Sequence, residues 1–230
     1  MSTIRFQLEK KDSVTDLDVV FDSLYAIGYA GRNKAKTLEH IQELKEQFGV
    51  PVPLKIPTIF QMSTMLLTQD REIDFVGSDS CGEVEYVIIT QGDKVYIGVG
   101  SDHTDRKLEG SNVPKAKQLC PKPIGKLVWD YEELKEHWDK IKLVAYQTVG
   151  GEEKLYQDGT LADILPVDVI LDELHKRVGS VSHSIIYSGT VPVKAGFVFG
   201  SVFRGEMIDP VLNRKLTFQY TVKEISEKER

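Results

Sequence analysis

The chain has 230 residues, of which 41% are hydrophobic and 28% charged, a composition that excludes a disordered or fibrous protein and predicts a single domain over residues 1–230. A formal net charge of −6, with no block of basic residues, argues against a nucleic acid or an anionic membrane as a partner. The two cysteines form no CxxC pair, and the chain has neither a secretory signal nor a long apolar span, so we expect a soluble cytoplasmic protein.

Short runs of alternating apolar and polar residues predict that most of the chain is β-structure. In chain order these runs are 2–8, 24–29, 83–90, 94–101, 140–149, 183–188, 196–204 and 215–225. Helical spacing of apolar residues predicts three helices, at 35–48, 130–139 and 167–177. Residues 109–128 contain three prolines and show no clear period, which predicts a long irregular connection. The fold class that follows is β-rich α+β.

Three acidic residues are expected to converge at one end of a predicted hairpin. Glu83 and Glu85 are two residues apart, so on a strand both side chains project from the same face. If Gly92 and Asp93 form a two-residue turn, the pairing that results places Asp102 opposite Glu83. A three-residue turn would shift this register and separate the carboxylates.

Such a cluster predicts a divalent cation, because three neighbouring carboxylates repel one another unless a cation or protons compensate them. Oxygen ligands without His or Cys favour Mg²⁺, with Mn²⁺ or Ca²⁺ as alternatives. Gly98 and Gly100 on the opposite strand are expected to leave room for the ion, its waters and a substrate. The alternative interpretation is an ordinary strand whose alternating glutamates face solvent.

Two residues that follow Asp102 bear on the same site. Arg106 lies four residues further on and could bind a substrate carboxylate with two hydrogen bonds, although an ion pair with Asp105 or Glu109 is the simpler alternative. His103 points to the other face if the strand continues, which predicts a packed or hydrogen-bonded histidine rather than a ligand.

Together with several shorter motifs, these residues resemble the fumarylacetoacetate hydrolase superfamily, in which an E-x-E pair and the Asp of an N-D-x-x-x-R segment hold a metal. The matching segments, in the family's order, are Gly31-Arg32-Asn33, His40-Ile41-Gln42-Glu43, Glu83-Val84-Glu85, Asp102 with Arg106, Lys117 ahead of Cys120-Pro121, and Ser188-Gly189-Thr190. Lys34, Gln61 and Ser101 depart from the family's pattern. The chain is therefore similar to a divergent branch of uncharacterised bacterial proteins of this fold.

The resemblance implies a mixed β-sheet roll with a few peripheral helices, a bound Mg²⁺ and a homodimer. It also implies a role for each matching residue: Glu83, Glu85 and Asp102 hold the metal; His40 and Glu43 form a lid pair that activates water or moves a proton; Lys117 stabilises developing charge; and Arg32, Arg106 and Thr190 bind substrate. The simpler alternative for Lys117 is a solvated lysine near Lys115 and Lys122. The simpler alternative for Glu43 is a position on the solvated face of an amphipathic helix whose apolar stripe includes Leu38.

The implied activity is a metal-dependent hydrolase that cleaves a C–C bond of a small 2-oxo acid or 1,3-dicarbonyl through an enolate. Decarboxylation or isomerisation on the same site is an alternative. A further alternative is a protein that binds the ion but catalyses no reaction.

Overall fold

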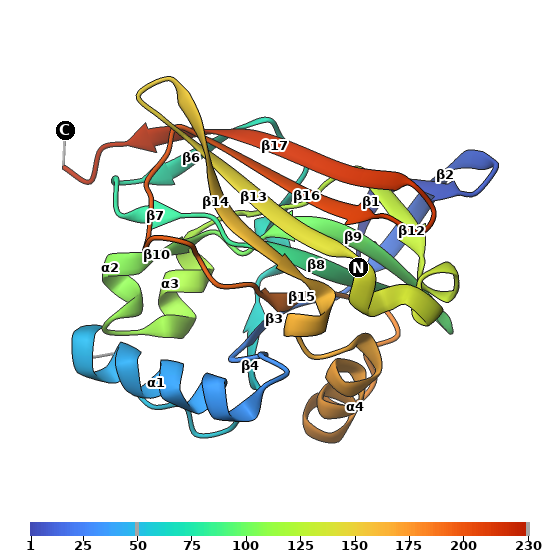
Figure 1. Ribbon diagram of the computed structural model, residues 1–230, viewed down its shortest axis with the longest axis horizontal. Helices are drawn as coiled ribbons and strands as arrows, with labels where there is room; N and C mark the ends of the chain where they lie inside the picture. The colour runs from blue at the N-terminus through green and yellow to red at the C-terminus, as the bar shows by residue number, and fades with distance from the viewer. Residues whose placement is uncertain (49–50, 229–230) are drawn as a thin grey trace.

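The computed structural model describes residues 1–48 and 51–228 and consists mainly of two β-sheets (Figure 1). The eight-stranded sheet has the order β2 (Ser13–Phe21), β1 (Ser2–Lys10), β12 (Leu127–Asp130), β9 (Lys94–Ser101), β8 (Val84–Gln91), β15 (Ser184–Thr190), β3 (Ser23–Gly28), β4 (Thr58–Met62). The five-stranded sheet has the order β14 (Glu152–Thr160), β13 (Lys142–Val149), β16 (Val202–Asp209), β17 (Arg214–Ile225), β6 (Glu72–Val76). The predicted β-rich α+β class is confirmed.

Two hydrophobic cores cover the two faces of the eight-stranded sheet. The larger core lies between the sheets, where Tyr86 of β8 packs in one cluster with Leu143 of β13 and Phe203 of β16. The smaller core contains Val19 from one edge strand, β2, and Met62 from the other, β4. Since both edges contribute to one cluster, the sheet must curl, which gives the predicted mixed roll.

Helices are few and lie outside the sheets. They are α1 (Lys34–Phe48), α2 (Arg106–Glu109), α3 (Val113–Leu119) and α4 (Val167–Val178), with 3-10 turns at Thr64–Leu66, Tyr131–Glu133, Lys135–Lys140 and Leu161–Asp163. The helices predicted at 35–48 and 167–177 are confirmed to within one residue. None of the helices in the described residues combines the length and the apolar character that a membrane span requires.

The β8–β9 hairpin has the register that the sequence predicts. Gly92 has a φ of 60°, which suits a two-residue turn, and Glu85 lies opposite Gly100. Beyond the ends of both strands, the N–H of Asp102 donates to the carbonyl oxygen of Glu83 at 3.0 Å. The turn therefore places Glu83 and Glu85 side by side with Asp102.

Three segments differ from the prediction. Residues 130–139 lie in two 3-10 turns instead of one helix, and the second turn is itself kinked at His137, which has a non-helical φ of −130°. The strand predicted at 196–204 begins only at Val202, since Gly196 adopts a φ of 81° that breaks an extended run. The segment 109–128 is largely regular, because Asn112 caps α3 and Pro114 occupies the first turn, where a helix tolerates it.

Two further short strand pairs bring this central segment against the hairpin. They are β10 (Thr104–Asp105) with β7 (Ser80–Cys81), and β11 (Lys122–Pro123) with β5 (Leu67–Thr68). The segment that contains α2, α3 and β11 therefore lies next to the end of β9. Both cysteines are free thiols and buried.

Candidate metal centre

The three predicted metal ligands meet at one end of the β8–β9 hairpin. Glu83 precedes β8, Glu85 lies on it and Asp102 follows β9, and one carboxylate oxygen from each lies within 4.8 Å of the others. Glu85 and Asp102 are buried, whereas the side chain of Glu83 keeps 16% of its exposure. The register predicted from the sequence therefore produces the predicted cluster.

Cationic side chains of the chain itself compensate two of these carboxylates, Asp102 and Glu83. Nζ of Lys117 binds Oδ2 of Asp102, and Nζ of Lys122 lies 3.3 Å from Oδ1 of the same carboxylate. A guanidinium nitrogen of Arg106 lies 3.3 Å from Glu83. Lys117 is buried, which contradicts the simpler alternative of a solvated lysine, and Lys122 is fully buried. Repulsion within the cluster is thus offset before any outside ion binds.

The two buried carboxylates differ in their ionisation. Burial raises the pKa of Glu85 well above its ordinary value, and the charge of Asp102 adds to this, although the N–H of Gly189 donates to Oε2 at 3.0 Å. Burial also disfavours the charge on Asp102, but Lys117 and Lys122 outweigh it and lower the pKa of this carboxyl to about 2. At neutral pH Asp102 is therefore the permanently charged member.

The raised pKa of Glu85 predicts an unusual pH dependence of stability in EDTA. The folded state binds this proton more readily than the unfolded state does, so the group's stabilisation is complete below its ordinary pKa of 4.5 and is lost as pH rises through its folded pKa. Above pH 4.5 the free energy of unfolding should therefore rise as the pH falls, by up to about 1.4 kcal/mol per pH unit below the folded pKa of Glu85. Denaturant unfolding at several pH values measures this slope.

The matched variant for this prediction is Glu85→Gln, which should flatten the slope over that range. Glu136→Gln removes an exposed carboxylate and should leave the slope as in the wild type. Asp102 does not interfere, because its contribution is lost only below its ordinary pKa of 3.8. Equal slopes in the wild type and Glu85→Gln would contradict the prediction.

The residues of the cluster fit a hard divalent cation. All three ligands are carboxylates, the donor type that Mg²⁺ prefers. Oδ1 of Asp102 is buried and accepts no hydrogen bond from any described residue, which leaves it available to an ion. Glu83, Glu85 and Asp102 would hold the cation.

The two glycines of β9 do not make room for the ion, contrary to expectation. A Cβ on Gly100 would lie 2.8 Å from the carbonyl oxygen of Pro123 and 2.8 Å from the ring of Tyr187, and one on Gly98 would touch Val128. The small residues therefore allow close packing of the curled sheet.

Arg106 joins the cluster to its surroundings. Besides Glu83, its guanidinium contacts Glu109 at 2.9 Å and Sγ of Cys81 at 3.1 Å, and the ring of Phe197 covers it at 4.4 Å. Arg106 thus lies beside Glu83 and forms the predicted alternative ion pair with Glu109, and its role in substrate binding remains a prediction. Asp105 has a different role, because its side chain caps α2 at the N–H of Leu108.

His103 is a packed histidine, as predicted. Its Nδ1 lies 2.8 Å from the hydroxyl of Tyr220, its Nε2 lies 3.0 Å from Oγ of Ser80, and its ring stacks on Phe75 at 3.8 Å. Burial lowers the pKa of His103 well below its ordinary value. The ring therefore stays neutral and supports the β9 end of the cluster from the opposite face.

Thr190, predicted to bind substrate, lies opposite Glu85 in the β15–β8 pairing. Its hydroxyl donates to the carbonyl oxygen of Val84 at 2.6 Å and receives a hydrogen bond from Gln157 at 2.7 Å. The hydroxyl is therefore already used within the protein. The role of Thr190 in substrate binding remains a prediction.

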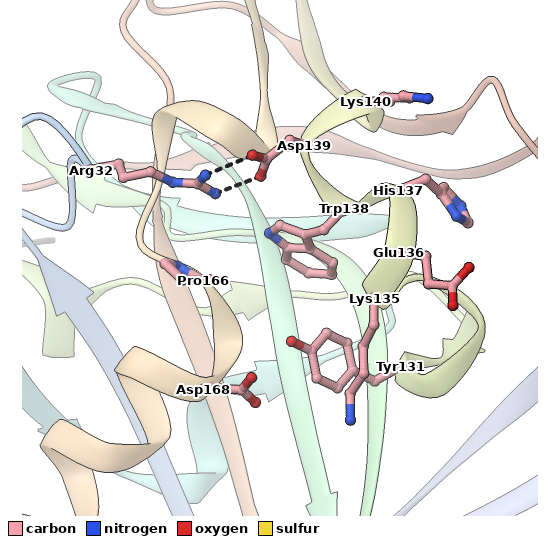
Figure 2. Close-up of a pocket in the computed structure, with 10 residues that line it drawn as sticks. All are labelled: Arg32, Tyr131, Lys135, Glu136, His137, Trp138, Asp139, Lys140, Pro166 and Asp168. Atoms are coloured by element: carbon pink, nitrogen blue, oxygen red, sulfur yellow. Dashed lines mark hydrogen bonds and ion pairs between the residues drawn. The ribbon is translucent and has the colours of Figure 1, made fainter.

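Arg32, also predicted to bind substrate, is used elsewhere. Its guanidinium pairs with Asp139 and donates to the carbonyl oxygens of Leu161 and Ile164. These contacts form one wall of a cavity of about 400 Å³, around the rings of Tyr131 and Trp138 (Figure 2). None of the described residues that line this cavity belongs to the three-carboxylate cluster.

The predicted lid pair lies on α1. Asn33 begins this helix by accepting from the N–H groups of Ala35 and Lys36. The side chain of His40 lies outside the described part of the chain, and Glu43 is on the exposed face. Leu38, expected in the apolar stripe, is 57% exposed. The catalytic role of His40 and Glu43 therefore remains a prediction.

Lys122 and the N–H of Gly189 are the members of the site that the sequence did not reveal. Lys122 is flanked by Pro121 and Pro123, and the residue before a proline favours an extended backbone, which is the only local signal for β11. Gly189 has a φ of 93°, and a Cβ there would lie 2.8 Å from Ala30. Because residue 189 is a glycine, the backbone can adopt this conformation and its N–H can reach Glu85.

The curled mixed sheet with few helices is the fumarylacetoacetate hydrolase-like class of fold, and several solved structures share this fold. The crystal structures of Cg1458 match with a TM-score of 0.65 at 16% identity, over 97% of this chain and 89% of that chain. 2-Keto-3-deoxy-D-arabinonate dehydratase complexed with magnesium and 2,5-dioxopentanoate matches with a TM-score of 0.62 at 14% identity, over 94% of this chain and 78% of that chain. At these identities the likeness shows the fold alone.

The family itself is given by the sequence match over most of the chain. Residues 27–220 match the family described as "Protein of unknown function (DUF2848)", and the chain belongs to this family. No curated protein matches the sequence.

Proposed function

We propose that this chain is a divalent-metal-dependent enzyme of the fumarylacetoacetate hydrolase superfamily that performs a lyase-type reaction on a small 2-oxo acid. The observation that carries the proposal is the convergence of three carboxylates within 4.8 Å beside a buried lysine on Asp102. A cation held by Glu83, Glu85 and Asp102 would polarise the carbonyl group of the substrate. One solved structure with this fold binds magnesium and 2,5-dioxopentanoate, which supports the choice of ion and substrate class.

Lys117 supplies a fixed positive charge in this proposal. Burial alone would lower its pKa, but Asp102 and Glu109 raise the pKa overall, so the ammonium group stays protonated at neutral pH. A permanently charged lysine cannot accept a proton from the substrate. It stabilises negative charge that develops on the substrate oxygen next to Asp102.

Arg106 and the exposed side of Glu83 form the entrance in this proposal. The guanidinium of Arg106 offers a second cation for the substrate carboxylate, four residues beyond Asp102. Dehydration is the first candidate reaction, because a dehydratase shares the fold. Hydrolysis of a C–C bond is the second candidate, because the predicted lid pair, His40 and Glu43, would serve to activate water.

Purified protein tested against a panel of 2-oxo acids and acylpyruvates checks the proposal. We expect turnover of at least one compound with Mg²⁺, none in EDTA, and recovery when Mg²⁺ is restored. Glu83→Gln should abolish this activity. In melting experiments oxalate should raise the melting temperature only when Mg²⁺ is present.

Other outcomes would point to the alternatives. Stabilisation by Mg²⁺ and oxalate without turnover of any compound would indicate a binding protein. No response to EDTA, Mg²⁺ or oxalate in either assay would contradict the metal centre.

A further inference from the structure

Lys122 is a buried cation at the candidate metal centre that the proposed reaction does not use. Its Nζ donates to the carbonyl oxygens of His103 at 2.6 Å, Lys117 at 2.6 Å and Cys120 at 3.1 Å. An ammonium group has three protons, so these acceptors use its whole donor capacity. Lys122 is thus held in place independently of any ligand.

The three acceptors show what this lysine joins together. The carbonyl groups of Lys117 and Cys120 belong to the end of α3, where a helix leaves carbonyls without partners, and His103 follows β9. Since Asp102 directly precedes His103, the amine holds the helix that carries Lys117 against the segment that carries Asp102. Both functional side chains are positioned through one buried group.

The same amine acts on the carboxylate of Asp102 through its charge. It lies 3.3 Å from Oδ1, the buried oxygen that accepts no hydrogen bond from a described residue. The three carbonyl groups are closer to the amine or better placed for its hydrogen bonds, so this contact acts mainly through charge. The oxygen most available to an outside cation therefore faces a fixed positive charge.

When all three carboxylates are ionised, as binding of a cation requires, the charges of the centre are balanced without an outside ion. Its carboxylates are Glu83, Glu85 and Asp102, and its cations are Arg106, Lys117 and Lys122. A divalent cation adds positive charge to this balanced and largely buried group. When the divalent cation is bound, one positive charge remains in excess even if Glu109, the second partner of Arg106, is counted with the three carboxylates. An anionic ligand removes this excess.

We propose that Lys122 is a positioning residue that fixes Asp102 and lowers the intrinsic affinity of the three carboxylates for a divalent cation, so that the cation binds strongly only together with an anionic ligand. The inference rests on the proposed function, because it presupposes the cation. It adds to that function a coupling between the ion and an anionic oxo acid.

Titration calorimetry on the full chain tests this coupling with Mg²⁺ and oxalate, after the binding of Mg²⁺ to free oxalate has been measured and subtracted. We expect saturating oxalate to tighten Mg²⁺ binding at least about tenfold, and Mg²⁺ to tighten oxalate binding by the same factor. A coupling below about twofold would overturn the inference while leaving the metal centre intact. Absence of Mg²⁺ binding under both conditions would overturn the proposed function and this inference with it.

Lys122→Gln separates the charge from a merely structural role, because the amide keeps two N–H donors for the carbonyl groups. We expect Mg²⁺ alone to bind about tenfold more tightly to this variant and the coupling to shrink. Lys126→Gln, an exposed lysine nearby, should change neither quantity. A folded Lys122→Gln variant with weaker Mg²⁺ binding and unchanged coupling would contradict the proposal. If this variant does not fold, the coupling between Mg²⁺ and oxalate measured on the wild type decides whether the proposal holds.

Discussion

Replacement of Asp102 by alanine is expected to lower the free energy of unfolding by about 3–5 kcal/mol and to weaken Mg²⁺ binding more than about 100-fold. The carboxylate is the counter-ion of two buried ammonium groups, those of Lys117 and Lys122. Its removal leaves both charges buried without their partner and removes one of three metal ligands. Denaturant unfolding in EDTA and calorimetric titration with Mg²⁺ measure the two effects.

A surface pair provides the control for this experiment. Asp18→Ala removes the same charge from an exposed ion pair with Arg5, whose atoms are 2.6 Å apart, and should leave stability and Mg²⁺ binding close to the wild type. Asp102→Asn keeps the shape of the side chain and should still abolish Mg²⁺ binding. If Asp102→Ala were as stable as Asp18→Ala, the two buried lysines would not depend on this carboxylate.

Replacement of Lys117 by methionine should lower kcat by about 10²–10³-fold on the 2-oxo acid that the wild type turns over best. Methionine preserves much of the apolar stem, while the charged Nζ, which lies 5.6 Å from the centre of the Phe60 ring, is lost beside the developing oxyanion. Mg²⁺ should still bind, because the three carboxylates remain. Steady-state kinetics and calorimetry on the same preparation measure both properties.

Lys115 offers a matched control on the same helix. Lys115→Met changes the same charge two residues earlier, where the side chain is exposed, and should keep the wild-type kcat. An unchanged kcat in Lys117→Met would exclude a catalytic role for this lysine. Loss of Mg²⁺ binding together with kcat would instead show that Lys117 supports the metal ligands.

Local sequence patterns predicted the parts of the fold that depend on neighbours in the chain. The alternation on either side of Gly92 and Asp93 encodes a hairpin whose short turn leaves one register, so Glu83, Glu85 and Asp102 could be brought together without a structure. Helices α1 and α4 were predicted to within one residue for a similar reason, since their apolar spacing is periodic.

Segments without a period were predicted poorly. Residues 109–128 contain α3 and β11, and their conformation depends on Asn112 as a cap and on pairing with the distant strand β5. The strand that begins at Val202 was displaced in the prediction, because the conformation of Gly196 cannot be read from an alternating pattern. Backbone conformations set by distant contacts leave little local trace.

The sequence by itself therefore determined which acidic side chains share a strand face and meet across a turn, because side-chain direction and short-turn register are local properties of the backbone. Only the tertiary structure decided how those carboxylates are compensated. Lys117 and Lys122 become buried partners of Asp102 when the segment after β9 folds back on the hairpin, and Gly189 arrives from β15, about a hundred residues further along the chain. Coulomb energies depend on distance in space, and that distance is set by packing rather than by sequence separation.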